Sequence, residues 1–309
     1  MRAGLALLAY VLIKGCDPTL LKWLQERGET AVARYGMQED PISFCNVFFF
    51  ASLATGLASL AIDLPGVKRQ LSALTSGDRL LLASRAALGF CIGPMAYFLA
   101  LRRLPVVSLT LIFTLILPVT AVLALVVLRE PLPKRFGLSL TLLPVGLWLS
   151  SSMAMPMASA ADRSTSLAGV LWALVSVVAF AIAGVLNRLT AGRPWGLGLS
   201  LGVTSLGAAV VFGLISLLLY GPDHFLYLRT WWVVGVLRIY AGVVRLGSEL
   251  CLLISYRHLG ALAVALWGNG VVVVALLSAH LFLGESLGPR TLAGAVGILA
   301  ALVVSGRDR

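Results

Sequence analysis

Long runs of apolar residues alternate with short polar segments along the whole chain. An α-helix needs about 20 apolar residues to cross the hydrocarbon core of a bilayer. Runs of that kind recur and predict ten membrane-spanning helices. We expect them at residues 5–24, 42–62, 80–101, 106–128, 136–153, 167–189, 196–220, 231–256, 261–283 and 291–305.

One stretch of this pattern occurs twice. Residues 102–132 align with residues 257–287 over 31 positions without a gap, at a shift of 155, and eight positions are identical. The identical residues include Arg102 and Arg257, and the motif Leu-x-Glu-x-Leu at 128–132 and 283–287. Because the shift is half of the chain length, we predict one module at 1–153, a linker at 154–166 and a second module at 167–309.

Each predicted module has five spans, an odd number, so the second module enters the membrane upside down relative to the first. Inverted repeats are typical of transporters, in which the halves rock around a central site. The sequence therefore predicts an all-α polytopic membrane protein, with ten transmembrane helices arranged as two inverted five-helix repeats.

Composition agrees with this class, since 59% of residues are hydrophobic and only 12% are charged. Soluble domains carry about 25% charged residues. The net charge of +11 lies at helix ends and in short loops rather than in a basic block, which argues against nucleic acid as a partner. On the predicted topology, twelve Lys and Arg residues lie on the side of both termini and eight on the other. Because cytoplasmic loops are enriched in positive charge, we expect a multi-pass protein of the inner (plasma) membrane with both termini in the cytoplasm.

Nothing in the sequence predicts an enzyme, a cofactor or a metal site. The cysteines lie inside predicted spans without ligand spacing, and they are Cys16, Cys45, Cys91 and Cys251. The chain also lacks a phosphate loop, a nucleophile elbow and a metal-ligand cluster.

Ionisable residues inside the spans are the strongest functional signal. Each costs about 2.5–3.5 kcal/mol at the middle of a membrane helix on insertion scales. Lys14 and Asp17 lie near the middle of the first span, three residues apart. One interpretation is that they neutralise each other, and the other is that one of them meets the substrate.

The third and eighth spans carry further charges. Arg85, Gly89, Gly93 and Tyr97 follow at four-residue steps, which places them on one stripe of an α-helix. Arg85 either faces inward with this stripe or extends to the membrane surface. The eighth span contains three charged residues at spacings of seven and four, namely Arg238, Arg245 and Glu249. The last two form either a structural i,i+4 pair or part of the substrate site.

The fourth and ninth spans contribute a polar position to each repeat. Thr114 and Asn269 are equivalent in the duplication, and Asn269 belongs to Trp267-Gly268-Asn269-Gly270. Two glycines beside an amide inside a span would expose backbone groups to a ligand, whereas a threonine often bonds its own helix. We interpret Glu130 and Glu285, at the ends of these spans, as helix caps or loop contacts.

Several of these segments resemble those of the drug/metabolite transporter superfamily, and of its EamA-type permeases in particular. The resemblance rests on Ala100-Leu101-Arg102-Arg103-Leu104-Pro105, on the glutamate-bearing ends at 128–130 and 283–285, and on Arg85 early in the third span. It implies that spans one to four and six to nine line a central cavity. It also implies that spans five and ten are scaffold, with a homodimer contact through them, and that transport is secondary.

The span charges indicate the kind of substrate. Lys14, Arg85, Arg238 and Arg245 outnumber Asp17 and Glu249 by two positive charges. We therefore expect export or exchange of a small metabolite, an organic anion or an amino acid, by alternating access. The alternatives are an exporter of lipophilic cationic drugs and a non-transporting scaffold that reuses the fold. The predicted substrate-binding residues are Lys14, Asp17, Arg85, Tyr97, Thr114, Arg238, Arg245, Glu249, Trp267 and Asn269.

Overall fold

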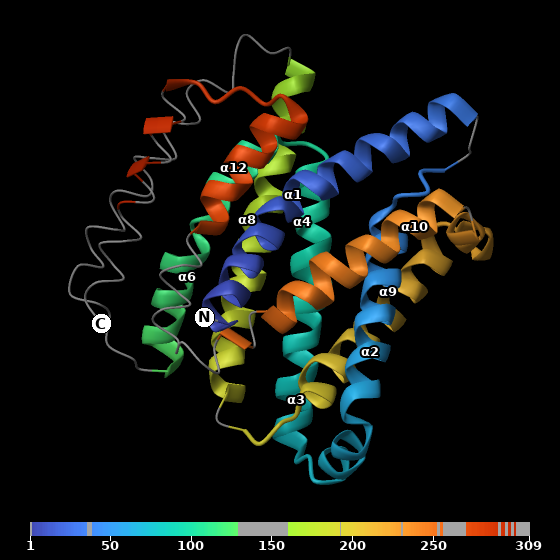
Figure 1. Cartoon of the computed structure of the whole chain (residues 1–309), viewed down its shortest axis with the longest axis vertical. Coiled ribbons are helices and arrows are strands. Elements are labelled where there is room, and N and C mark those ends of the chain that lie inside the picture. Colours follow the sequence, from blue (N-terminus) through green and yellow to red (C-terminus); the bar gives the residue numbers. More distant parts are fainter. Residues whose placement is uncertain are drawn as a thin grey trace. The chain divides into compact units, whose positions relative to one another are not determined.

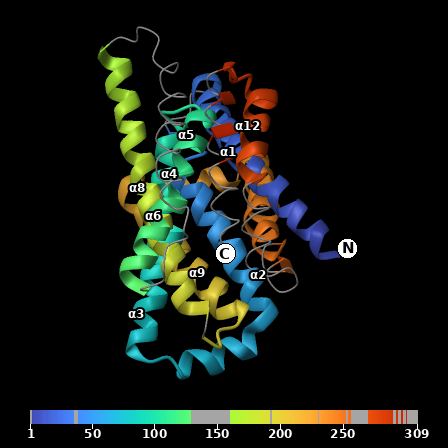
Figure 2. The same cartoon turned by 90° about the vertical axis from the view of Figure 1, so that its left-hand side faces the viewer.

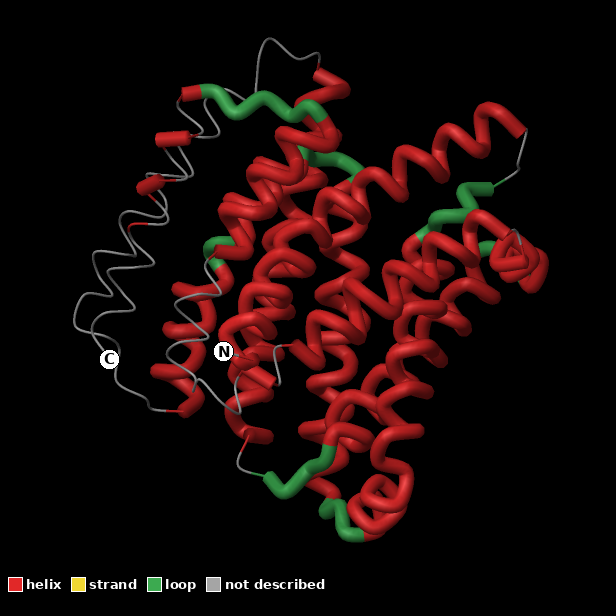
Figure 3. The backbone as a smooth tube through the Cα atoms, in the orientation of Figure 1, coloured by secondary structure: helices red, strands yellow, loops and turns green. Residues whose placement is uncertain are grey.

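The architecture is helical throughout the part of the chain that the computed structural model describes. The described residues are 2–35, 39–128, 160–191, 193–229, 231–251, 254–255, 270–289, 292–293, 296–297 and 300. Within these ranges every regular element is a helix, joined to the next by turns and loops (Figure 3). Six of the described helices are long and apolar enough to cross a membrane, and a shorter apolar helix covers Gly270–Leu283. The all-helical membrane class is confirmed.

The number of ten spans stays a prediction. The fifth predicted span, residues 136–153, and most of the tenth, residues 291–305, lie outside the described residues. The homodimer contact expected through these two spans is therefore a prediction as well.

The chain forms two compact units, each assembled from separate parts of the sequence. Unit 1 contains Met1–Trp23, Ala96–Ala181 and Gly247–Arg309, and unit 2 contains Leu24–Met95 and Ile182–Leu246. A shift of 155, the repeat interval, carries residues 24–95 onto 179–250, so unit 2 consists of equivalent segments of the two repeats. Each unit thus combines both repeats instead of corresponding to one of them.

Unit 1 is organised around the apolar helix near the C-terminus. Its helices are the first part of α1 (Arg2–Tyr35), most of α4 (Gly93–Leu101), α5 (Val106–Phe113), α6 (Ile116–Leu123), η2 (Ala124–Leu128), the first part of α8 (Ala160–Ala191) and α12 (Gly270–Leu283). α12 packs against α5 (Figure 2). It also approaches α1 closely, because Gly15 of α1 leaves room for Val274, and the Thr19 and Ser278 hydroxyls are hydrogen-bonded at 2.7 Å.

The start of α5 is held by a carboxylate from a distant part of unit 1. The first N–H groups of a helix have no partner within the helix, and Pro105, which precedes α5, offers no side-chain cap. Glu285 supplies both bonds: its two carboxylate oxygens accept from the N–H groups of Val106 and Val107 at 2.7 and 2.8 Å. The interpretation of Glu285 as a cap is confirmed, whereas Glu130 lies outside the described residues.

Unit 2 is built on two long helices that pack along each other, α2 (Phe44–Ser72) and α9 (Thr204–Leu219) (Figure 1). Its other helices are α3 (Ser76–Arg85), η1 (Ala86–Ile92), η3 (Gly198–Val203), η4 (Pro222–Arg229), α10 (Trp231–Ile239) and η5 (Tyr240–Gly247). The buried rings of Phe48 and Phe212 lie 5.4 Å apart between α2 and α9. Gly56 admits the Leu206 side chain at the same interface.

Three helices extend into segments that we expected to be loops or linker. α1 continues to Tyr35, beyond the span predicted at residues 5–24. α2 continues to Ser72, but its backbone leaves the helical conformation at Asp63 (φ −135°, ψ 37°), directly after the predicted end of the span at residue 62. α8 begins at Ala160, inside the predicted linker. The extensions of α1 and α8 contain charged and hydroxyl residues, such as Glu29, Thr30 and Arg34 in α1 and Asp162 and Arg163 in α8, which lower the hydropathy that marks a span.

The start of α2 also differs from the prediction. Asp40-Pro41 is typical of a helix start, with a capping carboxylate before a proline, but α2 begins at Phe44 with Ser43 as the N-cap. The Ser43 hydroxyl accepts from Asn46 N at 3.2 Å, and Asp40 instead accepts from Ile42 N at 2.8 Å. Asp40 therefore supports the turn that leads into the helix.

Close packing between α1 and α12 generates a prediction about α1. A side chain in place of Gly15 would meet Val274, whereas one in place of Gly4, in the same helix, would meet no atom within 4 Å. We expect Gly15→Val to lower stability by about 1–3 kcal/mol, the usual cost of overpacking, and Gly4→Val to have little effect. Apparent melting temperatures and monodisperse yields in detergent measure the difference. Equal values for the two variants would contradict the packing described for α12.

Candidate functional site

The predicted site residues divide between the two units. Unit 1 contains Lys14, Asp17, Tyr97, Thr114 and Glu249, and unit 2 contains Arg85, Arg238 and Arg245. Trp267 and Asn269 lie outside the described residues, so their predicted roles stay predictions.

Lys14 and Asp17 form an ion pair within α1. The Lys14 ammonium lies 2.7 Å from Asp17 Oδ2, and the expected neutralisation within the helix is therefore present. Asp17 is only 7% exposed, and its second oxygen, Oδ1, is buried without a hydrogen-bond partner among the described residues. Pro18 follows within the helix and has no N–H to donate to the Lys14 carbonyl. The middle of α1 therefore presents buried acceptors, which suit a donor such as an ammonium or a hydroxyl group.

The fourth predicted span is interrupted at Thr114. α5 ends at Phe113 and α6 begins at Ile116, so Thr114 and Leu115 form a turn within the span. Pro118 has no N–H, so the Thr114 carbonyl cannot receive the usual helical bond. The Thr114 hydroxyl donates to the Leu111 carbonyl at 2.6 Å, which agrees with the interpretation that it bonds its own helix. The interruption is a tightened turn, because Thr114 and Leu115 keep right-handed helical dihedrals and the apolar helix continues from Val106 to Val127.

Aromatic rings pack around this break in unit 1. The Tyr97 ring lies edge-to-face on Phe113 with centroids 4.8 Å apart. Phe113 in turn lies 6.1 Å from Phe180 of α8. Tyr97 therefore contributes to the packing beside Thr114, at the end of α5.

Arg85 lies in unit 2 at the junction of α3 and η1, where it is partly buried. Its guanidinium donates from Nη1 to the carbonyl of Ser200 at 3.1 Å, and the Thr204 hydroxyl donates to the same carbonyl at 2.7 Å. Ser200 belongs to η3, whose π-helical turns use i→i+5 bonds. Arg85 is thus positioned by backbone that an ordinary α-helix would not present, and it also lies 5.9 Å from the centre of the Phe90 ring.

The π-helical turns change the stripes that we inferred from the sequence. Four-residue steps place side chains in line only along an α-helix, but η1 covers Ala86–Ile92 and η5 covers Tyr240–Gly247. The stripe from Arg85 therefore does not continue unchanged through η1. Likewise, the spacing on which the Arg245–Glu249 pair depends does not hold through η5. Arg238 and Glu249 are exposed and Arg245 is half-buried.

Residues that position Arg85 and α1 escaped the sequence analysis because they are ordinary small polar side chains. Ser200, Thr204, Thr19 and Ser278 stand out by no motif or spacing. Two of their contacts, Arg85–Ser200 and Thr19–Ser278, join segments that lie more than a hundred residues apart in the sequence. The third, Thr204–Ser200, is local. The signals that the sequence did contain were Pro18 and Pro118, each of which removes a helical hydrogen bond inside a span.

An apolar groove of about 420 Å³ also lies in unit 2, between α2, α9 and η4. It is lined by Phe49, Leu53, Leu206, Ala209, Val210, Gly213, Leu214, Leu217 and Phe225. Because no lining side chain is polar, the groove does not provide the polar chemistry of the candidate site.

Comparison with known proteins identifies the relatives of this chain. The model of the EamA-like transporter family matches twice, over residues 30–152 and 167–307. The chain is also 24% identical over 302 residues to a protein of Synechocystis sp. named "Uncharacterized transporter sll1164". That alignment covers 96% of this chain and 84% of the relative.

The ion pair in α1 generates an asymmetric prediction. Lys14→Gln would leave the buried Asp17 carboxylate without its counter-ion, which costs about 3 kcal/mol or more for a buried pair. Asp17→Asn should cost less, because the Lys14 side chain is 33% exposed and retains access to solvent. Fluorescence-detected size-exclusion chromatography and apparent melting temperature measure both effects.

The double variant Lys14→Gln/Asp17→Asn is the matched control, and it should recover most of the folded yield lost by Lys14→Gln. If Lys14→Gln is as stable as the parent protein, the pair does not neutralise a buried charge and this account of α1 is wrong.

Proposed function

The chain belongs to the EamA-like transporter family, and on that premise we propose that it is a secondary transporter of a small organic anion or amino acid. The family match and the described apolar helices establish the class, a multi-pass membrane transporter. The substrate and the mechanism are argued from the charges that the spans contain.

The observation that carries the proposal is the distribution of positive charge in unit 2. The arginines that we placed in the third and eighth spans, Arg85, Arg238 and Arg245, all belong to this unit. Charge interactions are weakly screened in a low-dielectric slab, so a group of cations there attracts an anion more strongly than it would in water. A guanidinium also binds a carboxylate through two parallel N–H groups, which favours a carboxylate-bearing substrate.

The acidic residue of α1 does not offset this charge. Asp17 is neutralised by Lys14 within its own helix, at 2.7 Å. Glu249 is exposed. The ion pair of α1 leaves the surplus of two positive charges that we inferred from the sequence unchanged.

For the mechanism we propose alternating access of the two inverted repeats, with export or exchange as the direction. Two prolines inside the helices support it, Pro18 in α1 and Pro118 in α6, because each removes a backbone hydrogen bond and transporters bind substrate and coupling ions through backbone groups of their helices. The bias of Lys and Arg toward one side supports a cytoplasmic location for both termini in the plasma membrane.

The proposal predicts that the unit 2 arginines are needed for transport. Arg85→Gln and Arg238→Gln should each reduce uptake of a carboxylated substrate by reconstituted protein. We expect a loss of at least about thirtyfold in kcat/KM, which corresponds to about 2 kcal/mol of lost binding. Uptake of the labelled substrate into proteoliposomes measures the effect, with the amount of inserted protein determined for each variant.

Arg103→Gln is the matched control, because Arg103 is an exposed arginine whose guanidinium donates to Leu99 of the preceding turn. It should transport at the parental rate. If all three variants, Arg85→Gln, Arg238→Gln and Arg103→Gln, transport at the parental rate, the anion site does not lie at the unit 2 arginines.

A further inference from the structure

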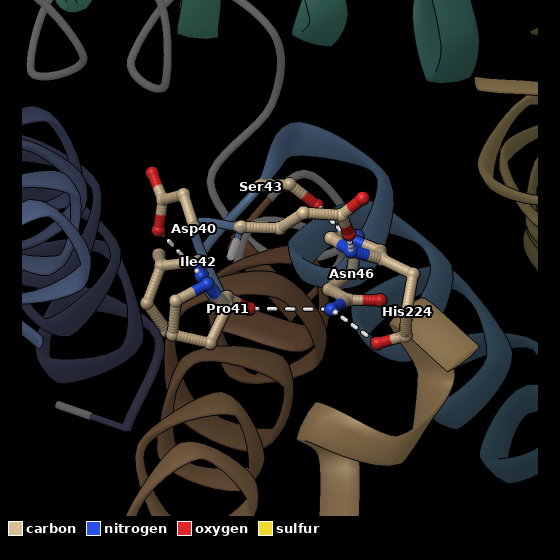
Figure 4. Close-up of polar contacts among 7 residues, drawn as sticks. Asp40, Pro41, Ile42, Ser43, Asn46 and His224 are labelled. Carbon is tan, nitrogen blue, oxygen red and sulfur yellow. Dashed lines mark hydrogen bonds and ion pairs between the residues drawn. The ribbon is translucent and has the colours of Figure 1, made fainter. Parts of the chain in front are cut away.

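A chain of short hydrogen bonds joins the residues before α2 to η4 within unit 2 (Figure 4). Glu39 Oε2 lies 2.6 Å from Nδ1 of His224, and Nε2 of His224 lies 2.7 Å from the Ser43 hydroxyl. The hydroxyl in turn accepts from Asn46 N at 3.2 Å as the N-cap of α2. The imidazole of His224 thus connects η4 to Glu39, which lies 185 positions earlier in the sequence.

The amide of Asn46 strengthens the same attachment. Its Nδ2 donates to the Pro41 carbonyl at 3.2 Å and to the His224 carbonyl at 3.4 Å. These two acceptors fix the orientation of the amide, which leaves Asn46 Oδ1 buried without a partner among the described residues. Turning this oxygen toward Ser43 would break both bonds of Nδ2.

His224 is enclosed by the rings of neighbouring residues. Its side chain is fully buried, stacked on Tyr220 at 4.2 Å and edge-on to Tyr227 at 5.6 Å. Ser43 is 3% exposed, so this serine, histidine and glutamate cannot act on an external carbonyl as a nucleophilic triad would. Glu39 is 32% exposed and is therefore the point at which protons reach the chain.

The number of hydrogens in this chain determines what it can bind. With the hydrogen of a neutral imidazole on Nδ1, each donor has one acceptor: Asn46 N–H on Ser43 Oγ, Ser43 O–H on Nε2, and Nδ1–H on Glu39. One more proton can bind at two places. On the imidazole, it gives both ring nitrogens a hydrogen. On Glu39, it makes the carboxyl a donor to Nδ1, so the hydrogen of the imidazole moves to Nε2. In either case Ser43 Oγ must accept from His224, so its own hydrogen loses the bond to Nε2. Among the described residues, Ser43 Oγ contacts no second acceptor for that hydrogen.

We propose that Glu39, His224 and Ser43 form a proton-binding site, and that a bound proton loosens the attachment of the residues before α2 to η4. The attached form matches every hydrogen without the proton, whereas with the proton the Ser43 hydroxyl hydrogen loses its bond to Nε2. The detached form lets water accept all the hydrogens, so it binds the proton more tightly. Acid therefore favours detachment, and this argument does not depend on the proposed substrate.

Other ionisable groups near His224 are few among the described residues. Asp40 precedes α2 and accepts from Ile42 N, and Asp223 is adjacent to His224 in η4. Tyr220 and Tyr227 face the imidazole from α9 and η4 through their rings. Glu39 is the carboxylate in direct contact with the imidazole.

Amide hydrogen exchange of the reconstituted full-length protein tests the proposal, because Asn46 N–H depends on the Ser43 cap. Histidine is the side chain that ordinarily titrates between about pH 7.5 and about pH 5.5. After correction for intrinsic rates, we expect exchange in residues 42–47 and 222–228 to be about tenfold faster at the lower pH, because the bound proton favours the detached form. Gly196 N, which bonds Gln70 elsewhere in unit 2, is the internal control and should not change.

Two variants decide the assignment. His224→Gln keeps a donor and an acceptor but does not titrate, so the pH dependence should disappear. Glu39→Gln removes the partly exposed carboxylate, so the midpoint should move to lower pH, and Asp223→Asn should leave it unchanged. The proposal is overturned if the parent protein shows no pH dependence, if acid slows exchange, or if His224→Gln retains the response. If His224→Gln does not fold, an unchanged midpoint in Glu39→Gln overturns it.

Discussion

The absence of water from a bilayer core is the constraint on which this structure depends, because every charge and backbone polar group placed there needs a partner within the protein. The described contacts follow from it. Lys14 neutralises Asp17, Arg85 bonds the Ser200 carbonyl, and Glu285 caps the first N–H groups of α5. Against that background, Asp17 Oδ1 stands out as a group available to a ligand, because it is buried and has no hydrogen-bond partner among the described residues.

Hydropathy located the helices well where apolar and polar residues meet sharply. The predicted starts at residues 106 and 231 coincide with those of α5 and α10, and Arg102-Arg103-Leu104-Pro105 and Trp231-Trp232 mark these boundaries. It failed where a helix outlasts its apolar stretch, as α1 does to Tyr35. In α2 the backbone leaves the helical conformation at Asp63, next to the predicted span end at residue 62. Helix propensity and hydrophobicity are separate properties of a residue, and only the second signals the membrane.

The candidate site was predictable to the extent that its contacts are local. Lys14 and Asp17 lie one helical turn apart, so their pairing follows from spacing alone. Contacts such as Arg85–Ser200 and Glu39–His224 depend on how distant helices approach, which a single sequence does not encode in any spacing. The π-helical turns of η1 and η5 also changed the inferred stripes, because four-residue steps describe an α-helix and not a π-helix.

The central claim is that this transporter carries a small anion because positive charge prevails among its span residues. Uptake by proteoliposomes that contain the parent protein tests the claim most directly, with a panel of labelled carboxylates, their neutral amides and lipophilic cations compared with protein-free liposomes. The account predicts protein-dependent uptake of at least one carboxylate and none of its amide. Protein-dependent uptake of lipophilic cations without any carboxylate would contradict it.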